Sequence, residues 1–402
     1  MPDDTYVLDL TVTGADLVTI NDDGHGSDTI SVQGVYAKTV EISLSSSAIG
    51  GQTLSASGYY YDQNDYGHRL LIKGLIENAF GSNGHDFIQG NEFANRLTGD
   101  AAFSGPGASD TIWGGMGGDT VHGGSGADEI FGDADDDLLF GNIGDDAIAG
   151  GSGRDTLEGG AGTDTLNGGG TLGDMLSYAG SAAGIRITLA SGALATGAGG
   201  DAAGDQVLGF SAVTGSALRD IITDADKSTL AGRANDNAFL GGGGGDLLKL
   251  GGGNDTGLGD NGNDMIFGEV GDDVLNGGLG NDGLSGGQGM DALTGGAGAD
   301  RFVFGSAADS SAAFALQDVI TDFDRANGDR IDLSAIDAAA ALGGNQAFHL
   351  ITTAFQGIGG ELRLVAQGSN LKVMGDIDGD LRADFAILLL EITVLAASDF
   401  IL

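Results

Sequence analysis

Aspartate recurs at one phase of a nine-residue repeat, and its spacing is the feature of this chain most able to do chemistry. The repeat reads GGxGxDxUx, where U is a large apolar residue. It fills two blocks of seven units each, Gly105–Asn167 and Gly241–Val303. Carboxylates at a fixed spacing predict a periodic set of ligands for a hard cation. The position-six residues are Asp110, Asp119, Asp128, Asp137, Asp146, Asp155 and Asp164 in the first block, and Asp246, Asp255, Asp264, Asp273, Asp282, Asp291 and Asp300 in the second.

Position eight keeps an apolar residue in register with the aspartate, which a flexible Gly/Asp linker would not do. We therefore expect position eight to lie on a short strand and to point inward. Glycines at positions one, two and four are expected to adopt positive φ. Gly257 is the one small residue at position eight, in a unit that begins with Leu250 instead of Gly, so we expect a distorted coil there.

Two nonapeptides form a coil of about eighteen residues, and stacked coils place the Asp of unit i near that of unit i+2, about 4.8 Å away. Facing carboxylates repel each other, and a cation with oxygen ligands removes the repulsion. Calcium fits because it takes 6–8 oxygens in flexible geometry, including turn carbonyls. Magnesium demands a stricter octahedron, and zinc would need His or Cys in phase. Five such pairs per block predict about five calcium ions per block.

The repeat resembles that of RTX (hemolysin-type calcium-binding repeat) proteins, whose repeats form a calcium-filled parallel β-roll. Beyond the repeats, Gln317–Asp324, Gly328–Ser334 and Ser398–Leu402 resemble the C-terminal domain of serralysin-type metalloproteases. This second resemblance covers roughly 300–402. Together the resemblances imply export from a Gram-negative bacterium by a type I (ABC transporter) system, with an uncleaved signal ending at Asp399–Leu402. They also imply folding on extracellular calcium, at the cell surface or in the medium.

The expected fold class is all-β. A parallel β-roll solenoid in two blocks is joined by intervening β segments and ends in a β-rich C-terminal cap. We divide the chain into an N-terminal β segment (1–80), a first roll block (81–170), an intervening β segment (171–214), a second block (215–303) and the serralysin-like domain (304–402). Asn95 and Asn237 stand at position six of the atypical units that open the blocks, which predicts weak or missing metal sites there. One short helix is expected near Ala338–Leu342.

Composition limits the partners. The net charge is −42 with only 16 Lys and Arg, so nucleic acid is excluded as a partner and cations are favoured. No apolar run of 18 residues occurs, so no transmembrane segment is expected. Cysteine is absent, and bound metal can supply the stability that disulfides would otherwise give.

A second metal candidate lies near the C-terminus, where carboxylates occupy positions 1, 3, 5 and 9 of one short segment. This spacing suits a single calcium loop, although it is not an EF-hand because position twelve is Ile387 rather than Glu. The alternative is an acidic hairpin turn, and the sequence leaves both open. The residues are Asp376, Asp378, Asp380 and Asp384.

The sequence offers no recognised catalytic motif. None of the five His has a second His four residues away, so the HExxH motif of a zinc protease is missing, and there is no GxSxG or Walker A motif. We expect a non-enzymatic surface, matrix or adhesion role. The alternative is a polysaccharide-modifying or other extracellular enzyme, or an enzyme subunit, with its site in 1–80 or 178–214. Tyr59–Asp62, with Tyr66, His68 and Arg69, could contact a surface polysaccharide or protein, although a strand with Tyr on both faces is the simpler interpretation.

Overall fold

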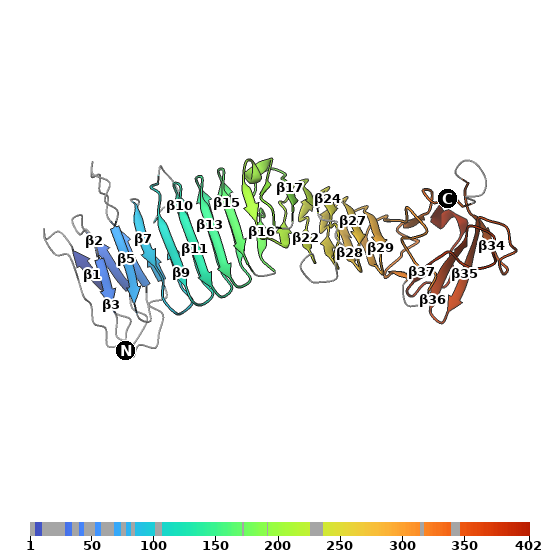
Figure 1. The fold of residues 1–402 in the computed structure, drawn as a ribbon, viewed down its shortest axis with the longest axis horizontal. Helices are drawn as coiled ribbons and strands as arrows, with labels where there is room; N and C mark the ends of the chain where they lie inside the picture. The colour runs from blue at the N-terminus through green and yellow to red at the C-terminus, as the bar shows by residue number, and fades with distance from the viewer. Residues whose placement is uncertain are drawn as a thin grey trace. The chain divides into compact units, whose positions relative to one another are not determined.

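A computed structural model describes thirteen stretches of the 402-residue chain. They are residues 5–9, 29–33, 40–43, 53–57, 68–73, 78–81, 85–100, 107–170, 173–190, 192–225, 236–313, 317–338 and 346–402. The chain forms two compact units, one of residues 1–180 and 192–212 and the other of residues 181–191 and 213–402 (Figure 1). Strand β20 (Ala212–Thr214) lies where the chain passes from the first unit to the second.

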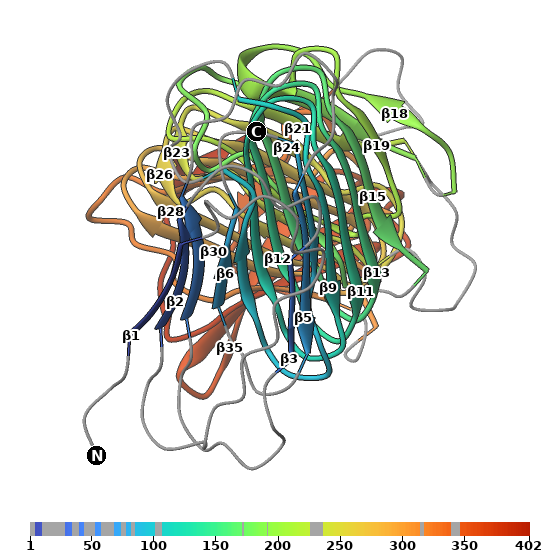
Figure 2. The ribbon, with the colours of Figure 1, turned by 90° about the vertical axis from the view of Figure 1, so that its left-hand side faces the viewer.

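The first unit consists of two parallel sheets whose strands alternate along the chain, so each coil adds one strand to each sheet (Figure 2). Sheet I contains β1 (Thr5–Asp9), β2 (Thr29–Gln33), β4 (Thr53–Ser57), β6 (Asn78–Phe80), β8 (Arg96–Thr98), β10 (Thr120–Ser125), β12 (Leu138–Ile143), β14 (Thr156–Ala161) and β16 (Met175–Ser177). Sheet II contains β3 (Val40–Ser43), β5 (His68–Lys73), β7 (Asp86–Gln89), β9 (Thr111–Gly115), β11 (Glu129–Ala134), β13 (Ala147–Ser152), β15 (Thr165–Gly169) and β19 (Gln206–Leu208), with β18 (Ala195–Thr196) antiparallel at its end.

The second unit repeats this plan. Sheet III contains β22 (Ala238–Leu240), β25 (Thr256–Leu258), β28 (Val274–Leu279), β30 (Ala292–Ala297), β32 (Asp318–Ile320) and β37 (Phe385–Leu389), with the two-residue strands β23 (Gly243–Gly244) and β26 (Asn261–Gly262) alongside. Sheet IV contains β17 (Arg186–Leu189), β21 (Ile221–Asp224), β24 (Leu247–Lys249), β27 (Met265–Val270), β29 (Gly283–Gln288), β31 (Arg301–Val303), β33 (Arg330–Asp332) and β38 (Phe400–Ile401).

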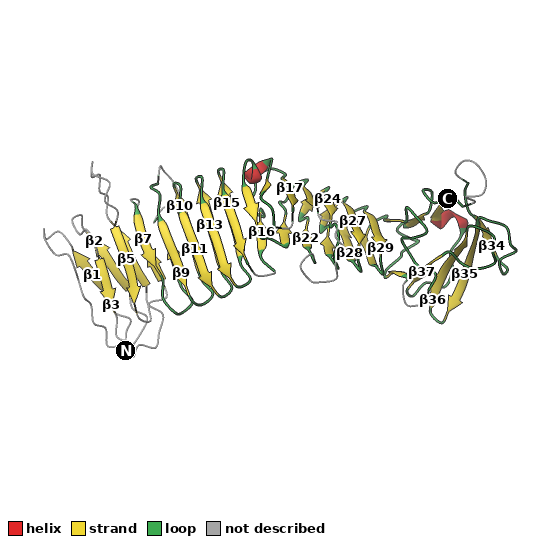
Figure 3. Ribbon diagram, in the orientation of Figure 1, coloured by secondary structure: helices red, strands yellow, loops and turns green. Residues whose placement is uncertain are grey.

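The C-terminal part changes to antiparallel pairing. Strand β36 (Asn370–Asp376) runs antiparallel to β35 (Glu361–Gln367) and to β37, and β34 (His349–Ile351) lies parallel to β35. The only helices among the described residues are the 3-10 turns Gly200–Ala202 and Ala397–Asp399 (Figure 3). The expected all-β roll with a β-rich C-terminal part is confirmed. The helix expected near Ala338–Leu342 lies almost wholly outside the described residues, as does most of the Tyr59–Asp62 cluster.

The core is built from position eight of the repeats, as predicted. Ile130, for example, pairs in register with Ile112 and Ile148 and is fully buried. Each such side chain contributes about 1.5–3 kcal/mol by leaving water. Where Gly257 leaves a gap, the side chain of Leu250 fills it, since a methyl group on Gly257 would lie 3.0 Å from Leu250 Cδ1. Leu250 is itself fully buried, so a residue from position one replaces the missing core side chain.

The glycines at positions two and four adopt positive φ, as Gly151 (114°) and Gly153 (146°) do, but those at position one do not. The prediction for position one was wrong, and close packing is the reason for glycine there. A methyl group on Gly132 would lie 2.4 Å from Asp137 Oδ2 and 2.5 Å from the carbonyl oxygen of Gly150. Where glycine occupies position one, the carboxylate of its own repeat packs against its Cα, and a methyl group would overlap that carboxylate.

The variant Gly132→Ala should lose about 1–3 kcal/mol of unfolding free energy, because its methyl group overpacks the turn. Gly170→Ala is the matched control, since a methyl group there meets no atom within 4 Å, and it should stay within about 0.5 kcal/mol of wild type. Urea unfolding at saturating calcium measures both. Equal losses in the two variants would contradict the close-packing account.

Candidate metal sites

The position-six aspartates are buried. Hydrogen bonds link those of alternate repeats into a row, so that each block has two neighbouring rows. The backbone N–H of each donates to Oδ1 of the Asp one coil further on, which confirms that units i and i+2 meet. Each Asp is between 0% and 3% exposed. The bonds are Asp110–Asp128, Asp119–Asp137 and Asp128–Asp146 (2.8 Å each), Asp137–Asp155 (3.0 Å) and Asp146–Asp164 (2.9 Å), then Asp246–Asp264, Asp255–Asp273 and Asp264–Asp282 (2.8 Å each), and Asp273–Asp291 and Asp282–Asp300 (2.9 Å each).

The second carboxylate oxygen, Oδ2, is buried without a hydrogen-bond partner in every one of these fourteen residues. Buried polar atoms are normally paired, because burying an unpaired one costs several kcal/mol and burying an unpaired charge costs more. One unpaired atom would be a local irregularity. The same atom left unpaired in every repeat indicates a periodic position for a group that the protein chain does not itself provide.

Glycine packing places a second oxygen beside Oδ2. In the third repeat, a methyl group on Gly123 would lie 2.4 Å from Asp128 Oδ2 and 2.9 Å from the carbonyl oxygen of Gly141, one coil further on. A carboxylate and a carbonyl oxygen border the same space at Gly114, Gly132, Gly141 and Gly150 of this block, and at Gly241, Gly259, Gly268 and Gly277 of the second. Hard oxygen donors of these two kinds fit calcium, whereas zinc would require nitrogen or sulfur ligands.

Burial raises the pKa of these carboxyl groups. It raises the pKa of Asp110 to about 9, with the charge of Asp86 adding to the effect, and the pKa of Asp137 and of Asp146 to about 8. Hydrogen bonds from backbone N–H groups act in the opposite direction, as the bond from Asp119 does for Asp137. Without a cation, the protonated forms of Asp110, Asp137 and Asp146 are therefore favoured near neutral pH.

One row in each block begins at an asparagine, Asn95 in the first block and Asn237 in the second. The Asn237 side chain donates to the Leu250 carbonyl oxygen at 3.1 Å and to Asp224 Oδ2 at 2.7 Å, and Asn95 Oδ1 accepts the N–H of Asn91 at 2.9 Å. Both Asn residues still donate their own N–H along the row, to Asp255 and Asp119 respectively. Their side chains are thus hydrogen-bonded within the protein, and the weak or missing metal sites expected there stay a prediction.

Sequence counting missed two residues with the geometry of the repeats. Asp174 and Asp318 are fully buried, each accepts a row hydrogen bond on Oδ1, and each has an unpaired Oδ2. They follow the preceding Asp of their rows, Asp155 and Asp291, by 19 and 27 residues instead of 18. A search that allowed loops between coils could have found them, since Asp174 immediately precedes a short apolar strand and Asp318 opens one.

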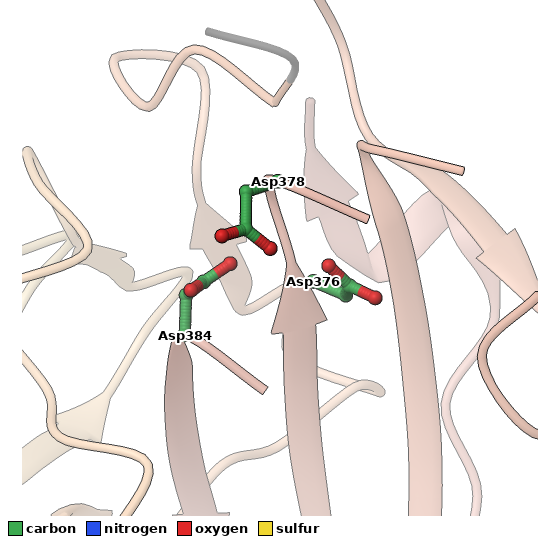
Figure 4. Close-up of side chains that lie close together, drawn as sticks. All are labelled: Asp376, Asp378 and Asp384. Carbon is green, nitrogen blue, oxygen red and sulfur yellow. The ribbon is translucent and has the colours of Figure 1, made fainter. Parts of the chain in front are cut away.

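The C-terminal candidate loop lies between β36 and β37. Carboxylate oxygens of Asp376, Asp378 and Asp384 lie within 4.8 Å of one another, and Figure 4 shows Asp378 and Asp384 facing each other beside Asp376. Asp380 is not part of this group of carboxylates, and its Oδ1 accepts the N–H of Arg382 at 2.8 Å. Burial raises the pKa of Asp376, and the charges of Asp384 and Asp378 raise it further.

Comparison with known proteins identifies the family. The family described as Peptidase M10 serralysin C terminal matches residues 11–402, nearly the whole chain, so the protein belongs to this family. The resemblance seen over roughly 300–402 is thus confirmed and extends through the repeats. No curated protein sequence matches the chain. A similar solved structure is the AlgE6R3 subunit of the mannuronan C5-epimerase from Azotobacter vinelandii, in solution. It is 25% identical, with a TM-score of 0.22, over 46% of this chain and 78% of that chain.

No helix among the described residues is long and apolar enough to span a membrane.

Calcium-stripped protein should lose β structure as the pH rises. The folded-state pKa values of these aspartates, about 6 to 9, lie above the ordinary value of 3.8. The folded chain therefore binds more protons than the unfolded chain at pH values between 3.8 and the folded-state pKa. Unfolding free energy is therefore greatest below about pH 4 and falls as the pH passes through the folded-state values. Far-UV circular dichroism between about pH 5 and 9, in dilute solution because the pI is near 4.1, measures the change. A β signal that grew with pH in the absence of calcium would contradict this.

Proposed function

We propose that this protein is a calcium-binding β-roll whose repeats fold as they bind calcium. The observation that carries the proposal is the row of buried, unpaired Oδ2 atoms, one in each nonapeptide. β-Rolls built from this repeat bind calcium. Calcium supplies the positive charge and the ligand contacts that each Oδ2 otherwise lacks, and we propose about five ions per block.

Each part of the repeat has a separate task in binding. The apolar residue at position eight holds the strand, glycine at position one gives room for the carboxylate, and Oδ1 is fixed by the N–H of the preceding coil. In the folded roll Oδ2 is thus held in place beside the position of the cation. Because these ligands meet only in the folded roll, the free energy of calcium binding contributes directly to folding.

We further propose that the protein is secreted by a type I system and folds outside the cell. Family membership supports this, since the resemblance to serralysin-type C-terminal domains implies that route. With a net charge of −42, the unfolded chain repels itself when calcium is scarce. Extracellular calcium modules have dissociation constants of about 10⁻⁴–10⁻³ M, which suits folding after export.

For the biological role, we propose a non-enzymatic surface, matrix or adhesion function. The missing catalytic motifs of the sequence support it. An enzyme acting on polysaccharide is the alternative. Incubating the calcium-bound chain with bacterial surface polysaccharides distinguishes the two, because binding without new reducing ends or altered sugar residues is expected, and catalytic turnover would overturn the proposed role.

The calcium sites are tested by Asp137→Asn against Asp136→Asn. Both remove one charge, but Asp137 is buried with an unpaired Oδ2, whereas Asp136 is exposed and accepts the Arg154 N–H. Asp137→Asn should lower the number of bound ions and raise the calcium midpoint at least about tenfold, since even outer-shell partners of metal ligands typically contribute 10–100-fold in affinity.

Equilibrium dialysis gives the number of ions. Trp113, the single tryptophan, stacks on Phe131 in the first block and gives a fluorescence signal for its folding. Asp136→Asn should match wild type in both measurements. Equal effects of the two variants would mean that the Asp row acts only through its total charge.

We also propose a calcium site at Asp376, Asp378 and Asp384, tested by Asp378→Asn against Asp380→Asn. Both Asp378 and Asp380 are exposed, and each accepts the N–H two residues on, but only Asp378 belongs to the carboxylate group. Calcium should shift the Gly379 amide resonance in wild type and in Asp380→Asn, and much less in Asp378→Asn. An unshifted Gly379 amide in wild type would leave the acidic hairpin turn as the correct interpretation.

A further inference from the structure

We propose that each block binds one more calcium ion than its repeats predict, at Asp174 after the first block and at Asp318 after the second. The other row of each block ends at Asp205 or Asp329, where a hydrogen-bond donor of the protein takes the place of the ion. This inference rests on the proposed calcium function and extends it to residues outside the nonapeptides.

Asp318 continues the row that contains Asp291. The Asp291 N–H donates to Asp318 Oδ1 at 3.0 Å, as each earlier Asp does to the next, and Asp318 Oδ2 is buried without a partner. The backbone N–H of Asp318 donates to Ser310 Oγ at 2.9 Å, which fixes the residue although the chain makes a longer excursion before it. Asp318 therefore presents the same unpaired oxygen as a repeat aspartate.

Asp174 does the same in the first unit. The Asp155 N–H donates to Asp174 Oδ1 at 3.0 Å, and Asp174 Oδ2 is again buried and unpaired. A methyl group on Gly168 would lie 3.0 Å from this Oδ2 and 2.7 Å from the carbonyl oxygen of Gly209. The space bordered by a carboxylate and a carbonyl oxygen thus recurs here with residues that do not belong to the repeat.

The neighbouring rows end at Asp205 and Asp329. Each accepts the row hydrogen bond on Oδ1, from Asp164 at 2.8 Å and from Asp300 at 2.9 Å. Here, however, the second oxygen has a donor. The buried Tyr178 hydroxyl donates to Asp205 Oδ2 at 3.0 Å, and the Asp324 N–H donates to Asp329 Oδ2 at 2.7 Å. A hydrogen directed at that oxygen stabilises the carboxylate and opposes a cation in the same position.

The two extra ions would tie non-repeat strands to the metal rows. Asp318 opens β32, which pairs with β30 of the repeats through Val319 and Ala292, and with β37 of the C-terminal part through Val319 and Leu388. Asp174 immediately precedes β16, which pairs with β14. Calcium at Asp318 would therefore make the docking of the C-terminal strands calcium-dependent, although they contain no nonapeptide.

The test compares calcium stoichiometry in full-length variants at saturating calcium by equilibrium dialysis. Asp318→Asn and Asp174→Asn should each bind one ion fewer than wild type. Asp329→Asn is the matched control, because Asp329 is also buried and bonded along its row, and it should bind as many ions as wild type. An unchanged count in Asp318→Asn and Asp174→Asn, or a lost ion in Asp329→Asn, would overturn the inference.

A second measurement needs no variant and covers the case in which a substitution prevents folding, which circular dichroism would reveal. Anomalous difference maps of wild-type crystals grown with calcium should show peaks beside Oδ2 of Asp174 and Asp318, and none beside Oδ2 of Asp205 and Asp329. Peaks along the repeats but not at Asp174 and Asp318 would overturn this inference alone. No peak in any row would overturn the proposed calcium function itself.

Discussion

A buried aspartate with one oxygen bonded and the other unpaired is the constraint on which the rest of this structure depends. Oδ1 receives the N–H of the preceding coil, which sets the coil spacing and the parallel register. Oδ2 cannot be satisfied by the same neighbour, because each Asp has only one backbone N–H to donate. Repetition of the coil thus repeats an unsatisfied oxygen, and a protein of this architecture has to bind cations, bind protons or unfold.

The remaining features of the repeat follow from this constraint. Where position one is glycine, the carboxylate of the same repeat packs against its Cα, and a side chain there would overlap that carboxylate. Where Leu250 replaces that glycine, its side chain turns into the core and fills the space above Gly257, so the coil keeps its packing while its strands become shorter. One row of each block meets the same requirement with a protein donor, because the Tyr178 hydroxyl and the Asp324 N–H donate to the final oxygens, of Asp205 and Asp329.

Much of this was predictable because the repeat encodes both contacts and periodicity. The phase of Asp128 and Ile130 predicted that aspartates of units i and i+2 meet and that position eight faces the core, and the structure shows both. The reason for glycine at position one was not predictable, since close approach and positive φ favour the same residue type. Asp318 was missed because a longer excursion precedes it, and spacing along the sequence does not show which residue returns to a row. Asp380 was grouped with Asp376 by spacing, but its carboxylate does not lie with those of Asp376, Asp378 and Asp384.

The most direct measurement of the central claim is far-UV circular dichroism of calcium-stripped protein at pH 8 during a calcium titration, with magnesium in parallel. The account predicts a cooperative rise of β signal with calcium, with a midpoint near 10⁻⁴–10⁻³ M, and little response to magnesium. A chain that is fully β-structured at pH 8 without calcium, and unchanged by its addition, would contradict the claim that cations satisfy the buried Oδ2 atoms.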